Sequence, residues 1–441
     1  MPEKNIKRRD FFKRTVATIG AAGAVTSAFS VQPSNVLGAN EKIVIALVGC
    51  GGMGKADLKD FLENSDVQCA AVCDVYEQNL GMAREMTGGK AKAYNDFRRL
   101  FDEGQSHIDA VIVATPDHWH ALPMIMACEA GKDVYVEKPL SLSIGEGRKM
   151  VEAARKYNRV VQTGMQQRSG AHFQRAVKIV QSGQLGEISL VRCWNYGNEY
   201  PDGMGTPPDS DPPQGLDWDF YLGPAPKVPF NKNRFLGTFR SFWDYSGGML
   251  TDWGTHLLDI VNWAMNVDAP KAVHASGGKY FIKDNRETPD TIEATFEYPN
   301  FICTYFNTVL NNHGMDGNNY GIQFYGTNGT LFVDRSGYEI FPEYKKVGDE
   351  SVARIAVVKS GSSEQHKAHV RNFLDCVKSR QKPVSEVEIC HHATLGPHLA
   401  NIAYKMKQRI EWNEVNERIT NVPEANQYLL RPYRAPWKLP E

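Results

Sequence analysis

The 441-residue sequence has almost no excess of either charge, with 50 lysines and arginines against 51 aspartates and glutamates. This balance gives no overall field that would favour nucleic acid as a partner. The eight cysteines form no CxxC pair and no regular spacing, so we predict buried free thiols rather than a disulfide framework. At this length, two domains are expected.

Long hydrophobic runs are also absent. Segment 15–31 is the nearest approach to one, but it is rich in alanine, glycine, serine and threonine and too weakly apolar to predict a membrane span. KRRDFFK, at 7–13, precedes it, and this combination is typical of a twin-arginine signal peptide. We therefore expect residues 1–39 to be a leader that engages the twin-arginine (Tat) export machinery and sends the protein to the periplasm or otherwise out of the cytoplasm. A disordered basic tail is the alternative.

Strand-like apolar runs alternate with helical segments between residues 43 and 165. Six strands are predicted, within 41–49, 67–74, 91–96, 108–116, 133–139 and 160–166. This alternation predicts an α/β fold with a doubly wound parallel sheet, and thus a Rossmann domain at 40–165.

A glycine-rich turn lies between the first predicted strand and the helix after it. Its GxGxxG pattern is formed by Gly49, Cys50, Gly51, Gly52, Met53 and Gly54. In this context the turn is predicted to hold the pyrophosphate of a dinucleotide at the helix N-terminus. Asp74 ends the second strand, where it can accept hydrogen bonds from a ribose 2′-hydroxyl. Val75 and Tyr76 follow, with no arginine for a 2′-phosphate, so NAD is favoured over NADP.

Three further strand ends add polar side chains to the predicted crevice. The cofactor-binding candidates there are Thr115, Pro116, His118, His120, Glu137, Lys138 and Gln166. Asp117 could simply cap the next helix, and the two histidines could be loop residues. Lys138, in the sequence EKP, would lie beside the nicotinamide ring and could polarise a substrate oxygen or relay a proton. A surface salt bridge is the alternative for this lysine.

Together these motifs make the sequence resemble the Gfo/Idh/MocA oxidoreductase family, which includes glucose–fructose oxidoreductase and inositol dehydrogenase. The resemblance covers about residues 43–413, and EKP in this position is its most specific part. It implies a C-terminal α+β domain at 166–415 with a large, open, mainly antiparallel sheet, then an extended tail at 416–441. Short β-rich runs between 271 and 344 agree. The family also forms homo-oligomers, commonly dimers or tetramers.

One helical segment, at 245–265, resembles the family's GG…D…H helix. Asp252 and His256 are four residues apart and share a face, which Asp259 continues. The rest of the helix is fit for burial, where such side chains are costly unless they serve a site. The resemblance implies that Lys138, Asp252 and His256 are catalytic. His256 would take the hydroxyl proton, Asp252 would orient it, and Lys138 would polarise the same oxygen.

Segment 195–244 is rich in glycine, proline and aromatic residues and is expected to be a long loop at the substrate side. Tyr196, Trp218, Tyr221 and Trp243 are candidates for stacking on a sugar, although the loop could instead be packed by its own aromatics. Arg168 is a candidate substrate contact. No metal is predicted, because the HxxH at 366–369 has no third ligand in register.

The sequence thus predicts an exported NAD-dependent oxidoreductase that acts on a secondary hydroxyl of a sugar, polyol or glycoside. Outside the cytoplasm a lost dinucleotide is not replaced, so the cofactor should be tightly bound. An NAD-dependent glycoside hydrolase using transient oxidation and elimination is the alternative, but hydrolases of this superfamily lack EKP. A silent binding protein is disfavoured by the intact Lys138, Asp252 and His256.

Overall fold

The computed structural model describes residues 42–102 and 107–440. The predicted leader at 1–39 lies outside these residues. Within them, no helix combines the length and the apolar character needed to cross a membrane. All eight cysteines are buried and free, which confirms the prediction made from their spacing.

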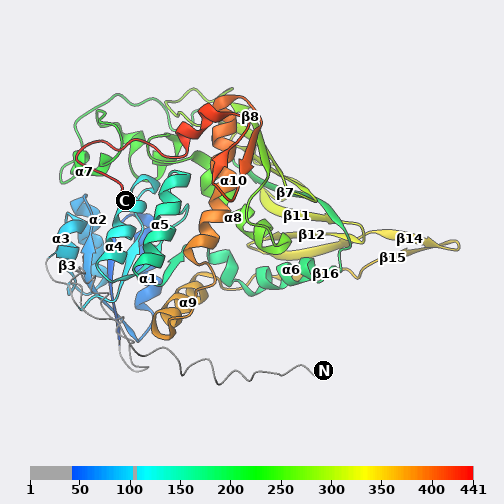
Figure 1. Ribbon diagram of the computed structural model, residues 1–441, viewed down its shortest axis with the longest axis horizontal. Helices are drawn as coiled ribbons and strands as arrows, with labels where there is room; N and C mark the ends of the chain where they lie inside the picture. The colour runs from blue at the N-terminus through cyan, green and yellow to red at the C-terminus, as the bar shows by residue number, and fades with distance from the viewer. Residues whose placement is uncertain (1–41, 103–106, 441) are drawn as a thin grey trace, which may run out of the picture. The chain divides into compact units, whose positions relative to one another are not determined.

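The N-terminal half contains a six-stranded parallel sheet in the order β3-β2-β1-β4-β5-β6 (Figure 1). Its strands are β1 (Ile43–Val48), β2 (Val67–Cys73), β3 (Lys92–Tyr94), β4 (Ala110–Val113), β5 (Asp133–Val136) and β6 (Val161–Thr163). The predicted doubly wound sheet is confirmed. The strand order reverses between β1 and β4, and ligands of such sheets bind at this reversal, beyond the carboxyl ends of the strands.

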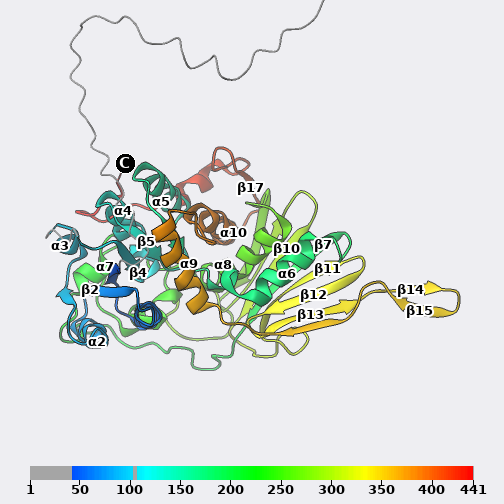
Figure 2. The same cartoon turned by 90° about the horizontal axis from the view of Figure 1, so that it is seen from below.

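Helices cover both faces of this sheet. One face is buried under α3 (Phe97–Asp102), α4 (Ala121–Glu129) and α5 (Ile144–Lys156), and the other under α1 (Gly52–Leu62), α2 (Glu77–Met86) and α9 (His366–Ser379). Helix α9 comes from the far end of the chain (Figure 2). The ring of its Phe373 lies 5.9 Å from that of Phe61 and 5.8 Å from that of Tyr135. The Rossmann core is therefore completed by residues from outside the domain.

A second sheet has ten strands in the order β16-β13-β12-β11-β7-β10-β9-β8-β17-β18. They are β7 (Ile188–Tyr196), β8 (Ala272–Gly278), β9 (Thr291–Glu297), β10 (Ile302–Thr308), β11 (Tyr320–Gly326), β12 (Gly329–Asp334), β13 (Gly337–Pro342), β16 (Val358–Gly361), β17 (Ile410–Asn413) and β18 (Arg418–Ile419). Neighbours pair antiparallel except β7 and β10, so the predicted, mainly antiparallel sheet is confirmed. The exposed hairpin of β14 (Tyr344–Val347) and β15 (Glu350–Ala353) projects from it (Figure 1).

Three helices pack on one face of the second sheet: α6 (Ala171–Gln181), α8 (Gly248–Met265) and α10 (Val387–Met406). Leu257 and Leu258 of α8 share a core with Phe296 of β9 and Leu399 of α10. The hydroxyl of Tyr305, in β10, donates to the carbonyl of Met249 at 3.0 Å. This packing fixes the start of α8, the helix that carries Asp252 and His256.

Candidate active site

The glycine turn after β1 has the geometry that close backbone packing requires. Gly49 has φ +92°, and a Cβ on it would meet the backbone of Ala114 at 2.6 Å. A Cβ on Gly54 would lie 1.9 Å from the carbonyl oxygen of Gly49. At Gly51 and Gly52, by contrast, an added Cβ would meet no atom within 4 Å. Two glycines are therefore demanded by packing, and the two between them leave the backbone open to a ligand.

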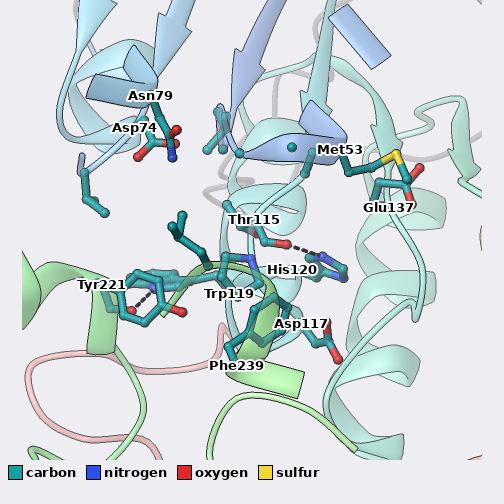
Figure 3. A pocket seen from close by; sticks show the side chains of 18 of the residues that line it. Met53, Asp74, Asn79, Thr115, Asp117, Trp119, His120, Glu137, Tyr221 and Phe239 are labelled. Carbon is teal, nitrogen blue, oxygen red and sulfur yellow. Dashed lines mark hydrogen bonds between the residues drawn. The ribbon is translucent and has the colours of Figure 1, made fainter. Parts of the chain in front are cut away.

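A cavity of about 520 Å³ lies beyond the carboxyl ends of the parallel strands (Figure 3). Ten of the predicted cofactor residues line it: Gly49, Gly51, Gly52, Met53, Asp74, Thr115, Pro116, His120, Glu137 and Lys138. Asp74 and Asn79 lie toward one end of it, and Met53 and Glu137 toward the other (Figure 3). Its volume is in the range of small-molecule and cofactor sites.

Asp74 is held by two backbone N–H groups. One of its carboxylate oxygens accepts from Cys50 at 2.6 Å, and the other from Tyr76 at 2.8 Å. Burial raises the pKa of Asp74 to about 6, although both N–H bonds and the charge of Lys55 act to lower it. Lys55 also lines the cavity and donates to Asn79 at 3.2 Å. Prediction from the sequence missed this lysine, which follows Gly54 in α1 and belongs to no motif.

Two polar side chains, Thr115 and His120, line the cavity in the loop after β4. The Thr115 hydroxyl lines the cavity and is buried, with no hydrogen-bond partner among the described residues. The two ring nitrogens of His120 contact the carbonyls of Pro139 at 2.7 Å and Thr115 at 2.8 Å. His120 therefore ties together the loops after β4 and β5, while Thr115 offers an unused hydroxyl to a ligand.

The aromatic loop predicted at the substrate side covers the described cavity. It includes α7 (Trp218–Leu222), η3 (Lys232–Arg234) and η4 (Leu236–Ser241), and its cavity-lining residues are Phe220, Tyr221, Phe235, Leu236, Gly237, Phe239 and Arg240. Trp218 stacks on Tyr221 at 5.0 Å. Trp243 does not line the described cavity, because the carbonyl of Glu287 accepts from its indole N–H at 3.1 Å and Lys405 lies over its ring at 4.3 Å.

Four predicted cofactor residues do not line the described cavity. The Cys50 thiol turns into the core toward the carbonyl of Cys73, and Gly54 packs beneath the turn. His118 is buried with Nε2 2.9 Å from the carbonyl of Tyr221, and burial lowers its pKa to about 3. Gln166 donates to Glu137 Oε1 at 3.0 Å. These four residues pack behind the wall of the cavity and do not line it.

Two predicted substrate contacts lie away from the described cavity. Arg168 is buried and its guanidinium binds both carboxylate oxygens of Asp259, at 2.8 and 2.9 Å from Nε. Tyr196 alternates along β7 with Val191 and Cys193, which pack in the core under α8. Its ring lies 5.2 Å from that of Phe306, on the sheet face opposite to the helices. Neither side chain lines the described cavity, and both stay predictions.

Lys138 and Asp252 meet where the two halves of the chain face each other. Lys138 Nζ lies 2.5 Å from Asp252 Oδ1, and Arg240 Nε lies 3.0 Å from the same oxygen. Burial alone would raise the pKa of Asp252, but the charges of Lys138 and Arg240 outweigh it and hold the pKa well below its usual range. Asp252 is therefore ionised. Prediction from the sequence missed Arg240, which no motif marks.

His256 lies one turn further along α8 and is 5% exposed. Among the described residues, its Nδ1 has no hydrogen-bond partner, and the Asp252 carboxylate binds Lys138 and Arg240 rather than the imidazole. The predicted orientation of His256 by Asp252 is thus wrong in this structure. Burial, followed by the charges of Lys138 and Arg335, lowers the pKa of His256 well below its ordinary value. The imidazole is neutral at neutral pH and able to accept a proton.

Comparison with known proteins identifies the two halves of the chain. Residues 43–165 match the family model for the NAD-binding Rossmann fold of the Gfo/Idh/MocA oxidoreductases, and residues 170–439 match the model for the C-terminal alpha/beta domain of that family. The chain belongs to the Gfo/Idh/MocA oxidoreductase family. The glycine turn, Asp74 and Thr115 are the residues of this family member that would hold NAD.

Several family members resemble the chain over most of its length. Myo-inositol 2-dehydrogenase of Thermotoga maritima is 21% identical over 372 residues, 84% of this chain and 99% of that protein. The WlbA dehydrogenase from Bordetella pertussis, solved with NADH and UDP-GlcNAcA, matches with a TM-score of 0.62 at 20% identity, covering 85% of this chain and 99% of its own. Aldose–aldose oxidoreductase from Caulobacter crescentus, complexed with glycerol, matches with a TM-score of 0.60 at 20% identity, covering 84% and 100%.

The glycine turn gives a first prediction. Gly54→Ala should abolish retention of NAD, because the added Cβ would lie 1.9 Å from the Gly49 carbonyl and force the turn apart. Gly81→Ala is the matched control, since Gly81 lies in α2, where an added Cβ would meet no atom within 4 Å. The control should keep its cofactor and gain about 0.5–1 kcal/mol of stability from the better helix former. Dinucleotide content after gel filtration measures the effect, and equal content in both variants would contradict it.

The neutral imidazole gives a second prediction. Because the pKa of His256 is lowered, kcat/KM for alcohol oxidation should stay level as pH falls through the ordinary histidine value of 6.5 and decline only below it, where the imidazole becomes protonated. His256→Asn should lower kcat/KM by about 10²- to 10⁴-fold. His274→Asn, at an exposed histidine of β8, is the control and should change neither the rate nor its pH profile. An acid limb at or above 6.5 in the wild-type profile would be inconsistent with this assignment.

Proposed function

We propose that the protein is an exported, NAD-dependent oxidoreductase that oxidises or reduces a secondary hydroxyl of a sugar, polyol or glycoside. One observation carries the proposal: the Lys138–Asp252 ion pair, 2.5 Å long, lies at the edge of a dinucleotide cavity, and Asp252 shares helix α8 with a neutral histidine. Relatives of the chain include an inositol dehydrogenase and an aldose–aldose oxidoreductase, which supports a polyhydroxylated substrate.

The residues around the ion pair supply what alcohol oxidation needs. NAD, when bound, accepts a hydride from the carbon that bears the hydroxyl. Lys138 uses one of its three N–H donors on Asp252 Oδ1 and approaches the Asp252 carbonyl at 3.3 Å, so a further donor is available for the substrate oxygen. The neutral imidazole of His256 takes the hydroxyl proton. In the reverse direction His256 returns that proton to the oxygen.

The roof of the cavity, formed by segment 218–241, supports tight retention of the cofactor. Trp119 and Phe220 line the cavity, and Trp437 of the C-terminal segment packs against their rings at 4.8 and 5.3 Å. Arg434 donates to the carbonyl of Gly223 at 2.9 Å, and Arg431 Nη2 donates to that of His118 at 2.6 Å. Segment 431–437 therefore contacts both the roof and the Rossmann domain. A cofactor under this roof would leave only after these contacts open.

A third prediction tests the fastened roof. Trp437→Ala should speed the loss of bound NAD about tenfold, since removal of the indole takes a packing partner worth about 1.4 kcal/mol from the closed state. The control is Tyr344→Ala, which truncates an exposed aromatic residue of the β14–β15 hairpin far from the roof in sequence. Dissociation is followed by transfer of the dinucleotide to an excess of a scavenging dehydrogenase. Equal rates in the two variants would argue against a role for the C-terminal segment.

The function itself is tested on protein purified from its native compartment. Mass spectrometry of the denatured protein should find stoichiometric NAD and a chain lacking about residues 1–39. Addition of the substrate sugar should then raise the absorbance of reduced nicotinamide. Release of free sugar from a glycoside without net reduction would support the hydrolase instead. Ligand binding without either reaction would contradict both enzymes, and the absence of bound dinucleotide would contradict tight retention.

A further inference from the structure

Arg335 is a half-buried arginine on the turn between β12 and β13. Its guanidinium lies over the ring of Trp253 at 4.9 Å, and its backbone N–H donates to the hydroxyl of Tyr320 at 2.9 Å. Among the described residues, Nε of Arg335 is buried without a hydrogen-bond partner, and the guanidinium forms no ion pair. The side chain is thus fixed in place, but its charge is not neutralised by the protein.

Other interior arginines of the chain are paired. Arg168 lies 2.8 Å from Asp259, Arg240 lies 3.0 Å from Asp252, and Arg286 lies 2.8 Å from Asp284. Such pairing is expected, because withdrawing a cation from water is costly unless an anion or hydrogen-bond acceptor compensates it. Arg335 departs from this pattern, because it is half-buried and no acid of the described residues pairs with it.

The location of Arg335 connects it to the proposed reaction. Trp253, on which it stacks, follows Asp252 directly in α8, and the Trp253 ring lies 6.5 Å from that of His256. The charge of Arg335 also acts on His256, after burial and Lys138. The nearest ionised acid on this helix, Asp252, already serves Lys138 and Arg240. The surroundings of His256 therefore carry an excess of positive charge.

Two acids lie in the wider neighbourhood, but neither is paired with Arg335. His366 is a half-buried histidine at the start of α9. The charges of Asp60 and Glu364 act to raise its pKa, and the charge of Arg335 acts to lower it. In the described part of the chain, neither acid forms an ion pair with Arg335. Glu364 instead accepts from the backbone N–H of His366 at 2.9 Å. Arg335 is thus available to pair with an anionic ligand.

We infer that Arg335 binds a carboxylate of the substrate, so that the sugar or polyol oxidised at Lys138 and His256 is an acidic one, of the uronic or aldonic acid class. The two Nη groups of a guanidinium can match the two oxygens of a carboxylate, and the Trp253 ring, 4.9 Å away, supports the guanidinium. The inference rests on the proposed function and adds the substrate class to it.

Matched sugars test the substrate class. Wild-type holoenzyme is assayed with D-glucose, D-glucuronate, D-gluconate and glucose 6-phosphate for reduction of its bound cofactor. At least one of the two carboxylates should have a KM about tenfold or more below that of glucose, as expected for a charge-assisted hydrogen bond. Preference for glucose, or for the phosphate over both carboxylates, would overturn the inference.

Variants then test the residue. Arg335→Gln should raise KM for the preferred acid about 10- to 100-fold and leave kcat within about threefold, because the lost contact is distant from the reacting carbon. Arg335→Lys should recover part of the loss. Arg175→Gln, at an exposed arginine of α6, is the control and should behave as wild type. Unchanged KM in Arg335→Gln would overturn the inference.

A binding measurement separates this inference from the proposed function. Calorimetry with the acidic sugars and NADH-loaded enzyme needs no turnover. If no sugar reduces the cofactor but an acid binds wild type and not Arg335→Gln, the carboxylate site stands and the oxidoreductase proposal fails. If neither acid binds wild type, while glucose is oxidised, the carboxylate site fails and the oxidoreductase proposal stands.

Discussion

The ion pair between Lys138 and Asp252 is the contact on which the site depends. Lys138 lies just beyond the end of β5 in the Rossmann sheet, and Asp252 lies in the helix that packs on the second sheet. Their side chains are only 9% and 13% exposed, so each charge would be costly without the other. The pair thereby holds the dinucleotide cavity against the helix that carries His256. Neither half of the chain contains a complete site.

The surrounding contacts follow from that constraint. Arg240 contacts Asp252 from the segment that covers the cavity, so this segment is held by the same carboxylate as Lys138. Burial, followed by the charges of Lys138 and Arg335, lowers the pKa of His256, so the imidazole stays neutral beside the ionised Asp252. The same positive surroundings extend to Arg335. The Asp252 carboxylate thus connects the Rossmann half, the segment that covers the cavity and helix α8.

Much of this could be predicted from local sequence, because the signals are local. The glycine turn, Asp74 and Lys138 each follow a strand with a clear apolar run, and Asp252 and His256 share a helix face by spacing alone. The predicted site residues that do not line the cavity have packing partners distant in the chain. Arg168 is bound by Asp259, 91 residues away, and His118 by the carbonyl of Tyr221, 103 residues away. Tyr196 faces away from α8 because of the register of β7, a strand whose mixed burial pattern gave no clear alternation.

The coupling between Lys138 and Asp252 is the claim that a single measurement tests most directly. A double-mutant cycle with Lys138→Met, Asp252→Asn and the double variant would follow the rate at which the substrate sugar reduces the bound cofactor. If the pair acts as a unit, the double variant should be no slower than the slower single variant, because the second change has no intact pair left to break. Losses that multiply would show that the two residues act independently and would contradict the account.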